Sequence, residues 1–280
     1  MLLQLQHSHN FNFTGYKRSS LIRRIQKRMQ MLPIVGYNNY SDYLKANPQE
    51  FSYLFNLIEI NVTSFFRDAQ VWAYIATKVI PDIIANKSES EPIRVWSAGC
   101  ASGEEIYSLA ILLAEALGVE QFQARVTIFA TDVDTGALQQ ARRGMYSVYN
   151  VADISPNRLN NYFQLANNAY VFHKHLKPKI IFRQHNLIKD APMSKIDLLM
   201  CRNVLIYLNI EAQIRVLARF YFSVVNSGFL CLGKAELLPI NGSMPIFNLI
   251  NHQNHIFNKV PKQNLDQYLL HKALGQSPQN

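Results

Sequence analysis

The sequence predicts an α/β fold: a doubly wound, mostly parallel sheet with an N-terminal all-helical domain and a small inserted β-subdomain. Between residues 93 and 232, short continuous apolar runs alternate with helical segments, which is typical of parallel sheets covered on both faces. Residues 1–85 instead carry apolar side chains at helical spacing only. Residues 146–179 interrupt the alternation with turn signals, and a subdomain explains them better than an improbably long loop.

The composition places the chain among globular proteins. Its 28 basic and 19 acidic residues give a formal charge of +9, and 49% of its positions are hydrophobic, so it lacks the signature of disorder. No apolar run is long enough to span a bilayer, and the N-terminus does not resemble a secretory signal. Cys201 and Cys231 lie within apolar runs, as buried thiols do in a reducing compartment. We therefore expect a cytoplasmic protein without membrane insertion.

The positive charge is concentrated near the N-terminus. No acidic residue precedes Asp42, whereas six cations do. They are Lys17, Arg18, Arg23, Arg24, Lys27 and Arg28. Leu21, Ile25 and Met29 recur at helical spacing, so we expect this stripe to pack on the protein and the arginines to face a partner. Nucleic acid, an acidic protein surface and plain solvation are all compatible with such a helix.

The remaining elements follow from local signals. In the helical domain, Ser41 opens a second helix and Pro48 a third. The polar stretch 86–92 is the expected linker. Strands are expected at 93–96, 126–130, 180–182, 196–200 and 229–232, with helices at 104–117, 138–142 and 211–225. We thus expect domains at 1–85 and 86–261, followed by a flexible tail at 262–280.

The turn after the first expected strand is a candidate ligand site. Gly99 and Gly103 allow the backbone to approach a ligand closely, and the next helix begins with free N–H groups. Glu104 and Glu105 would repel a phosphate there, but they suit a ligand with a cationic group. Both acids also favour a first helical turn without any ligand.

Another acid stands at the end of the second expected strand. An aspartate such as Asp132 at this position commonly binds both hydroxyls of a ribose, although it also suits the start of the next helix as an N-cap. A small-residue turn, an acidic helix start and a strand-end aspartate together describe a nucleoside that carries an amino acid. S-adenosylmethionine fits this description better than a dinucleotide.

Two further strings carry candidate functional side chains. Residues 61–67 place Asn61, Thr63 and Arg67 beside two phenylalanines at the end of the helical domain. Residues 200–207 leave the fourth expected strand, at the edge of the sheet where ligands bind in doubly wound folds. Without any ligand, the phenylalanines would be core residues and Arg202 would form a surface ion pair.

Taken with their order and spacing, these strings resemble the CheR family of chemotaxis-receptor methyltransferases over residues 13–260. The resemblance rests on residues 61–67, 95–108, 131–135, 186–187 and 201–207. It implies a class I, Rossmann-like enzyme that transfers a methyl group from S-adenosylmethionine to receptor glutamates, with no metal. The implied partner is a chemoreceptor helical bundle or a similar acidic signalling protein. A monomer is expected, and nucleic acid is not an expected partner.

The resemblance also implies roles for individual residues. Arg67 and Tyr207 would act on the methyl group and the incoming carboxylate, so they are the expected catalytic residues. Asp132 would hold the ribose, and Glu105 would lie near the methionine part. The residues expected at the cofactor are Asn61, Thr63, Arg67, Gly99, Gly103, Glu105, Asp132, Asn186, Leu187, Arg202 and Asn203.

Some positions depart from the family pattern. Residues 233–236 read Gly-Lys-Ala-Glu where the family often has Gly-His-Ser-Glu, and Ile106 stands where proline is frequent. Residues 146–179 correspond to the region with which some relatives hold a receptor-tail peptide. Two alternatives stay open. A nucleic-acid methyltransferase is favoured by the basic helix alone, and a non-catalytic signalling module would have no need of Arg67 and Tyr207.

Overall fold

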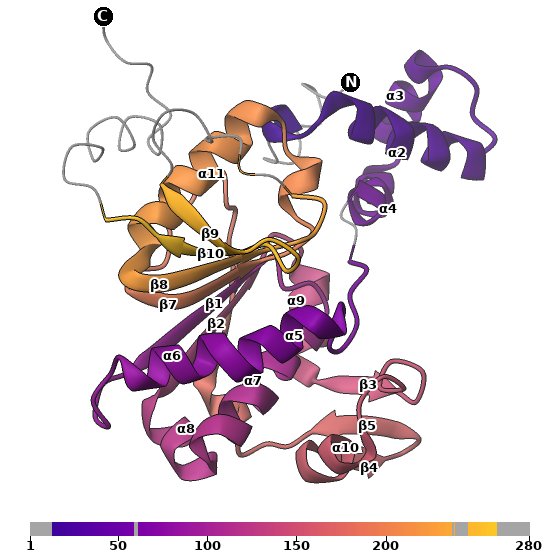
Figure 1. Cartoon of the computed structure of the whole chain (residues 1–280). Helices are drawn as coiled ribbons and strands as arrows, with labels where there is room; N and C mark the ends of the chain where they lie inside the picture. Colours follow the sequence, from indigo (N-terminus) through magenta and orange to yellow (C-terminus); the bar gives the residue numbers. More distant parts are fainter. Residues whose placement is uncertain (1–12, 59–60, 237, 239–245, 262–280) are drawn as a thin grey trace, which may run out of the picture.

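The computed structural model describes residues 13–58, 61–236, 238 and 246–261. The flexible tail expected at 262–280 lies outside the described residues. Within them, a small helical unit and a larger sheet unit lie side by side, with a three-stranded subdomain attached to the sheet unit (Figure 1). No helix in this part of the chain is long and apolar enough to cross a membrane.

The helical unit consists of α2 to α4 around an apolar cluster of its own. After the 3-10 turn η1 (Phe13–Gly15), its helices are α2 (Arg18–Met31), α3 (Tyr37–Ala46) and α4 (Pro48–Ile58). The stripe Leu21, Ile25 and Met29 is buried in this cluster as the spacing predicts. Helix α3 begins four residues earlier than Ser41: its N-cap residue is Gly36, whose φ of 91° is a conformation that favours glycine.

One arginine of α2 does not face outward as the sequence suggests. Arg28 donates from Nε and Nη2 to the two carboxylate oxygens of Glu50 in α4, each at 2.7 Å. Tyr40 of α3 donates its hydroxyl to the same carboxylate at 2.8 Å. Glu50 is 3% exposed, so this ion pair ties the three helices together. The expectation that Arg28 meets a partner is wrong, because burial of Glu50 requires its cation.

The next helical segment belongs with the sheet rather than with the helical unit. Helix α5 (Ala69–Tyr74), the π-helical turn η2 (Ile75–Val79) and α6 (Ile80–Ala85) follow one another without a break. Their buried side chains, among them Trp72 and Ile80, lie in the same apolar cluster as the first sheet strands. The domain limits at 1–85 and 86–261 stay a prediction, and this packing favours a division before α5.

The predicted doubly wound sheet is confirmed. It has seven strands in the order β6-β2-β1-β7-β8-β10-β9. The strands are β1 (Ile93–Ala98), β2 (Val126–Asp132), β6 (Ile180–Gln184), β7 (Ile196–Cys201), β8 (Val224–Leu232), β9 (Phe247–Asn251) and β10 (Ile256–Lys259). The first five strands of that order pair in parallel, whereas β10 runs antiparallel to both β8 and β9. The last hairpin was not predicted: in Phe247–Asn251 the apolar residues Phe247, Leu249 and Ile250 do not alternate strictly with polar ones, and only Phe247 is buried.

Helices cover both faces of this sheet. Helix α7 (Glu104–Leu117) lies with α5, α6 and α8 (Val119–Arg125) on one face, and α11 (Ile210–Ser223) lies on the other (Figure 1). Helix α9 (Thr135–Arg143) connects β2 to the subdomain and contacts β2 and β6. Because all five parallel strands end at the same edge, the loops that follow them meet there.

The inserted subdomain contains an antiparallel sheet of order β3-β5-β4. Its elements are β3 (Met145–Ser147), α10 (Pro156–Tyr162), β4 (Phe163–Ala166) and β5 (Ala169–Phe172), and the 3-10 turn η3 (Lys177–Lys179) leads back to β6. Phe65 packs edge-on against Tyr146 and Phe163, with ring centroids 4.8 and 5.5 Å away. The subdomain therefore shares a core with the chain next to Arg67.

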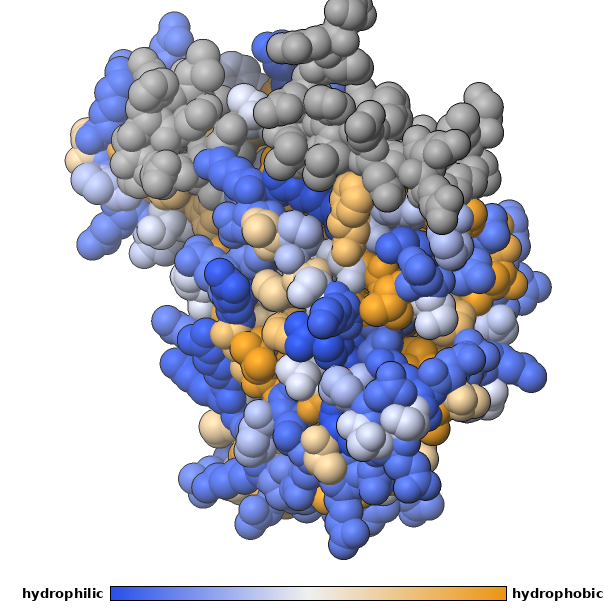
Figure 2. Space-filling view, turned by 90° about the vertical axis from the view of Figure 1, so that its left-hand side faces the viewer, coloured by the Kyte–Doolittle hydropathy of each residue, from blue (hydrophilic) through white to orange (hydrophobic). Residues whose placement is uncertain are grey.

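The surface on the side away from the helical unit is mostly hydrophilic. Figure 2 shows this face with hydrophobic residues confined to patches between polar ones. Apolar atoms contribute a large part of the surface of most globular proteins.

Candidate cofactor and substrate site

A cavity opens at the carboxyl ends of β1, β2 and β7, where the helical unit faces the sheet unit. All but one of the site residues predicted from the sequence line this cavity. They are Asn61, Thr63, Arg67, Gly99, Glu105, Asp132, Asn186, Leu187, Arg202, Asn203 and Tyr207. Gly103 does not line it. The cavity thus collects side chains from five loops that are far apart in the sequence.

The turn after β1 brings the backbone close to the cavity. Gly99 has φ of 82°, and a Cβ there would clash with Val204. The N–H groups of Gly99 and Cys100 donate to the carbonyl of Thr131 at 2.8 and 2.9 Å, which fixes the turn against β2. Gly103, with φ of 98°, serves packing instead: a Cβ would lie 2.9 Å from that of Ala141 in α9.

Asp132 lies at the end of β2 and is 8% exposed. Its Oδ2 accepts the N–H of Ala101 at 2.8 Å, and its Oδ1 accepts that of Asp134 at 3.0 Å. Burial raises the pKa of Asp132, and these backbone donors oppose that rise. A carboxylate has about four acceptor sites, so Asp132 keeps acceptor capacity for a ligand hydroxyl beside its backbone donors. Asp132 does not cap α9, because Asp134 accepts from Gly136 and Ala137.

Asn61 joins the helical side of the cavity to α9. Its amide donates to Oδ2 of Asp134 at 2.6 Å, so one side of Asn61 is occupied by the helix cap. Across the cavity, Oδ1 of Asn186 accepts the N–H of Ile188 at 2.9 Å and shapes the turn after β6. Leu187 in that turn packs against the apolar cluster beneath α11. These side chains build the walls of the cavity as well as lining it.

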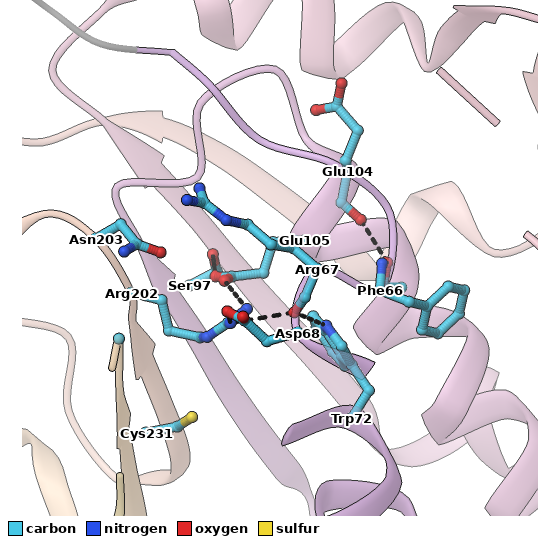
Figure 3. A network of polar contacts seen from close by, with 12 residues as sticks. Phe66, Arg67, Asp68, Trp72, Ser97, Glu104, Glu105, Arg202, Asn203 and Cys231 are labelled. Atoms are coloured by element: carbon cyan, nitrogen blue, oxygen red, sulfur yellow. Dashed lines mark hydrogen bonds and ion pairs between the residues drawn. The ribbon is translucent and has the colours of Figure 1, made fainter. Parts of the chain in front are cut away.

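Glu105 and Arg202 form a buried charge network with Asp68 (Figure 3). Arg202 Nη2 lies 2.5 Å from Asp68 Oδ2, and its Nη1 lies 3.5 Å from Glu105 Oε2. Ser97 donates to the other oxygen of Glu105 at 2.8 Å. Burial raises the pKa of Glu105, and the Arg202 charge opposes the rise. The side chain of Arg202 is 3% exposed and that of Asp68 is 29% exposed, so the ion pair that the sequence allowed at the surface has a buried arginine.

Arg67 lies in a constrained segment at the cavity. Its neighbours Phe66 and Asp68 have positive φ angles of 49° and 62°. Its carbonyl accepts from Trp72 Nε1 at 2.9 Å and from Arg202 Nη2 at 3.1 Å, while its own Nη1 donates to the carbonyl of Val62 at 3.0 Å. Arg202 therefore holds the backbone of Arg67, and the guanidinium of Arg67 lies on the cavity wall.

Tyr207 comes from the short 3-10 helix η4 (Leu205–Tyr207) that follows β7. Its carbonyl accepts the N–H of Lys17 at 2.8 Å, which connects this helix to the start of α2. Burial raises the pKa of Tyr207, and the nearby charges of Arg24 and Arg67 oppose the rise. The positive charges of Arg24 on α2 and of Arg67 thus both act on Tyr207.

The structure adds residues that the sequence did not single out. Tyr16 and His185 also line the cavity. His185 is 3% exposed, and its ring packs edge-on against Trp96 with the centroids 5.4 Å apart. Burial lowers the pKa of His185, which favours the neutral ring. Its position directly before Asn186 was the one signal available from the sequence.

The sheet and the cavity define the class of protein. A parallel sheet in this strand order, with a glycine turn after β1 and an aspartate at the end of β2, is the arrangement of a nucleoside-binding α/β enzyme. The buried carboxylate of Glu105 beside the same turn suits the cationic amino group of a bound amino acid. The residues present therefore fit S-adenosylmethionine, as in a class I methyltransferase.

Comparison with known proteins identifies the family. The model for the CheR methyltransferase SAM-binding domain matches residues 61–271, and that for the CheR all-alpha domain matches residues 4–58. The chain belongs to the CheR methyltransferase family, as its motifs predict. Methylation of receptor glutamates with S-adenosylmethionine is the known role of this family.

Individual relatives are similar over most of this chain. The chemotaxis protein methyltransferase 2 of Vibrio cholerae is 32% identical over 230 residues, covering 80% of this chain and 79% of that protein. The chemotaxis protein methyltransferase of Salmonella typhimurium is 32% identical over 79% of this chain and 76% of its own length. An uncharacterized 104.1 kDa protein of Rhodobacter capsulatus is 36% identical over 82% of this chain, which spans 24% of that longer protein.

Proposed function

We propose that this chain methylates glutamate side chains of a chemoreceptor, or of a related signalling protein, and forms glutamate methyl esters. The observation that supports the proposal is that Arg67, Tyr207, Glu105 and Asp132 all line one cavity. S-adenosylmethionine supplies a methyl group that is already activated on a sulfonium. The chain would hold it with Asp132 at the ribose and Glu105 at the amino acid end.

The chain's own task is positioning. A glutamate carboxylate is ionised at neutral pH, so no general base is required. The reduction of the barrier should then come from aligning the carboxylate oxygen with the methyl group. The planar fork of Arg67 can orient that carboxylate, and its bond to the Val62 carbonyl limits how closely it neutralises the charge. Tyr207 would bound the space where the two meet.

The partner proposed from the charges is an acidic helical bundle. Arg23 and Lys27 are exposed on α2. Arg24, on the same helix, carries a charge that acts on Tyr207 of η4. Complementary charge would steer a receptor carboxylate toward the cavity mouth. A cytoplasmic location belongs to the same proposal, since the substrate faces of chemoreceptors lie in the cytoplasm. The monomeric state that the resemblance implies stays a prediction.

The direct test incubates the chain with labelled S-adenosylmethionine and receptor-containing membranes. We expect base-labile label, which is typical of carboxyl esters, on a receptor band. Base-stable label, or label on added nucleic acid, would contradict the proposal.

Site variants then separate chemistry from binding. Arg67→Ala and Tyr207→Phe should lower kcat by about tenfold or more and reduce cofactor affinity by a smaller factor, because they act on alignment. Asp132→Asn should do the opposite and weaken binding of S-adenosylhomocysteine by about 1.5–3 kcal/mol, as measured by calorimetry. Wild-type turnover in Tyr207→Phe, or unchanged affinity in Asp132→Asn, would remove that residue from its role.

A further inference from the structure

We propose that Glu236 is a positioning residue for methyl transfer: its carboxylate holds the start of η4 and thereby places Tyr207 at the cavity. The inference rests on the proposed function, which it deepens by assigning a residue outside the cavity. Glu236 follows β8 and is 2% exposed. Glu236 itself does not line the cavity.

One carboxylate collects four backbone donors. Oε1 of Glu236 accepts the N–H groups of Val204 and Leu205 at 2.8 and 2.7 Å. Oε2 accepts those of Asn203 and Gly233 at 3.0 and 2.6 Å. Three of the donors are consecutive residues, and their N–H groups all point to the one carboxylate.

This convergence requires an acceptor from elsewhere in the chain. The first N–H groups of a helix have no partner inside it, and Asn203 adds a turn with φ of 61°. A carboxylate carries acceptor sites on both oxygens and makes strong charge-assisted bonds to backbone N–H groups. Glu236 therefore caps η4 from more than 30 residues away, as a local N-cap residue would do.

The hydrogen bonds of η4 carry this constraint to Tyr207. The N–H of Tyr207 donates to the carbonyl of Val204 at 3.2 Å, directly beside the capped N–H groups. The other end of the turn is held by Lys17, which donates to the carbonyl of Tyr207. Tyr207 is thus fixed between Glu236 on the sheet unit and α2 on the helical unit.

The surroundings of Glu236 are built for this contact. A Cβ at Gly233 would lie 2.8 Å from the Asn203 nitrogen and 2.9 Å from Glu236 Oε2, so glycine allows the approach. His255 Nδ1 lies 2.9 Å from the Glu236 carbonyl and fixes its backbone. Glu236 therefore does not depend on the cavity for its own position.

The first test compares Glu236→Gln with Asp197→Asn. The carboxamide has the same shape but turns an NH2 group toward N–H donors, so η4 should shift. A displacement near 1 Å can cost about 100-fold in rate, and we expect kcat to fall by at least about tenfold. Binding of S-adenosylhomocysteine should fall by a smaller factor than kcat, since Glu236 also holds the N–H of Asn203, which lines the cavity. Asp197 is the matched control: it is a buried carboxylate at the start of β7, bound to the Arg94 N–H at 2.8 Å and to Lys87 at 3.0 Å.

Asp197→Asn should lower the melting temperature without lowering kcat. Equal losses of kcat in both variants would reduce Glu236 to a stability role and overturn the proposal. So would wild-type kcat in Glu236→Gln.

The second test is independent of activity. Hydrogen exchange at the amides of residues 203–205 should accelerate in Glu236→Gln, while strand β1 keeps its protection. Gly233→Ala, which forces the same groups apart, should reproduce both effects if Glu236→Gln folds poorly. Unchanged exchange at these amides would overturn the inference even if the enzyme methylates receptors. Faster exchange in a chain that methylates no receptor would instead count against the proposed function alone.

Discussion

At the scale of single residues, Glu104 and Glu105 are neighbours with separate surroundings. Figure 3 shows their side chains pointing away from each other. Glu105 joins the Arg202 network at the cavity, whereas Glu104 is 2% exposed and accepts a hydrogen bond from Ser102 at 2.7 Å. Both lie in the first turn of α7, as the sequence allowed. They are also buried, and burial raises the pKa of each carboxyl.

Glu104→Gln should therefore change how stability depends on pH. The pKa of Glu104 is raised in the folded state, so the folded chain binds more protons than the unfolded chain between the two pKa values. Stability falls as pH rises through this window and stays lower above it. The Gln variant lacks this loss. The difference between its melting temperature and that of wild type should therefore shift in favour of the variant from pH 4 to pH 8. A difference of about 1 kcal/mol corresponds to a few degrees.

The control for this prediction is Glu120→Gln, at an exposed site on α8. Thermal unfolding of all three proteins across the pH range provides the measurement. A melting difference between Glu104→Gln and wild type that is independent of pH would contradict the assigned burial effect.

At the scale of elements, α2 combines a structural face and a charged face. Its buried stripe and the Arg28–Glu50 pair hold the helical unit together. Arg23 and Lys27 are left exposed, and Arg24 lies half-buried near Tyr207. The residues available to a partner are thus a subset of the six cations in the sequence.

Charge reversal on α2 should slow receptor methylation. Arg23→Glu is expected to lower the rate roughly threefold or more at low salt, because it removes steering charge. The effect should shrink at about 0.15 M salt, where exposed charges are screened beyond about 8 Å. Initial rates at several salt concentrations measure it, with Lys78→Glu on the exposed side of η2 as a control of equal charge change. Equal rates for both variants at every salt concentration would indicate a merely solvated helix face.

At the scale of the whole molecule, the apolar cluster of the helical unit is separate from the cluster that α5–α6 share with the first sheet strands. The cluster of α2–α4 ends at Ile58, and the cluster of the sheet begins at Phe65. Between them runs the segment that leads to Arg67. The α5–α6 segment contributes Val71, Trp72 and Ile75, together with other buried side chains, to the sheet core.

Truncation tests this division. A fragment of residues 61–261 should unfold cooperatively, whereas a fragment of residues 86–261 should aggregate. Each fully buried apolar side chain lost from the core costs about 1.5–3 kcal/mol, and α5–α6 supplies several of them. Calorimetry and light scattering of the two fragments provide the comparison. Cooperative unfolding of the 86–261 fragment would support the boundary predicted from the sequence.

The sequence by itself determined the features that depend on neighbouring residues. Apolar runs, helix starts and glycine turns are local signals. They predicted the parallel strands, the glycine turn between β1 and α7, and the acid at the end of β2. Because parallel strands end at one edge of a sheet, the same local signals predicted that residues after β1, β2 and β7 would meet. Segments with weak periodicity, such as α8 and the β9–β10 hairpin, were missed.

Only the tertiary structure decided the partners of the charged groups. Arg28 meets Glu50 across 22 residues, Arg202 meets Asp68 across 134, and Glu236 reaches Leu205 across 31. The periodicity of a sequence does not predict contacts at such sequence separations, because they depend on the cost of burying a charge without a partner. For this reason Arg28, expected to face a partner, instead connects two helices. Arg202, expected in a surface ion pair, is instead buried and supports the backbone of Arg67.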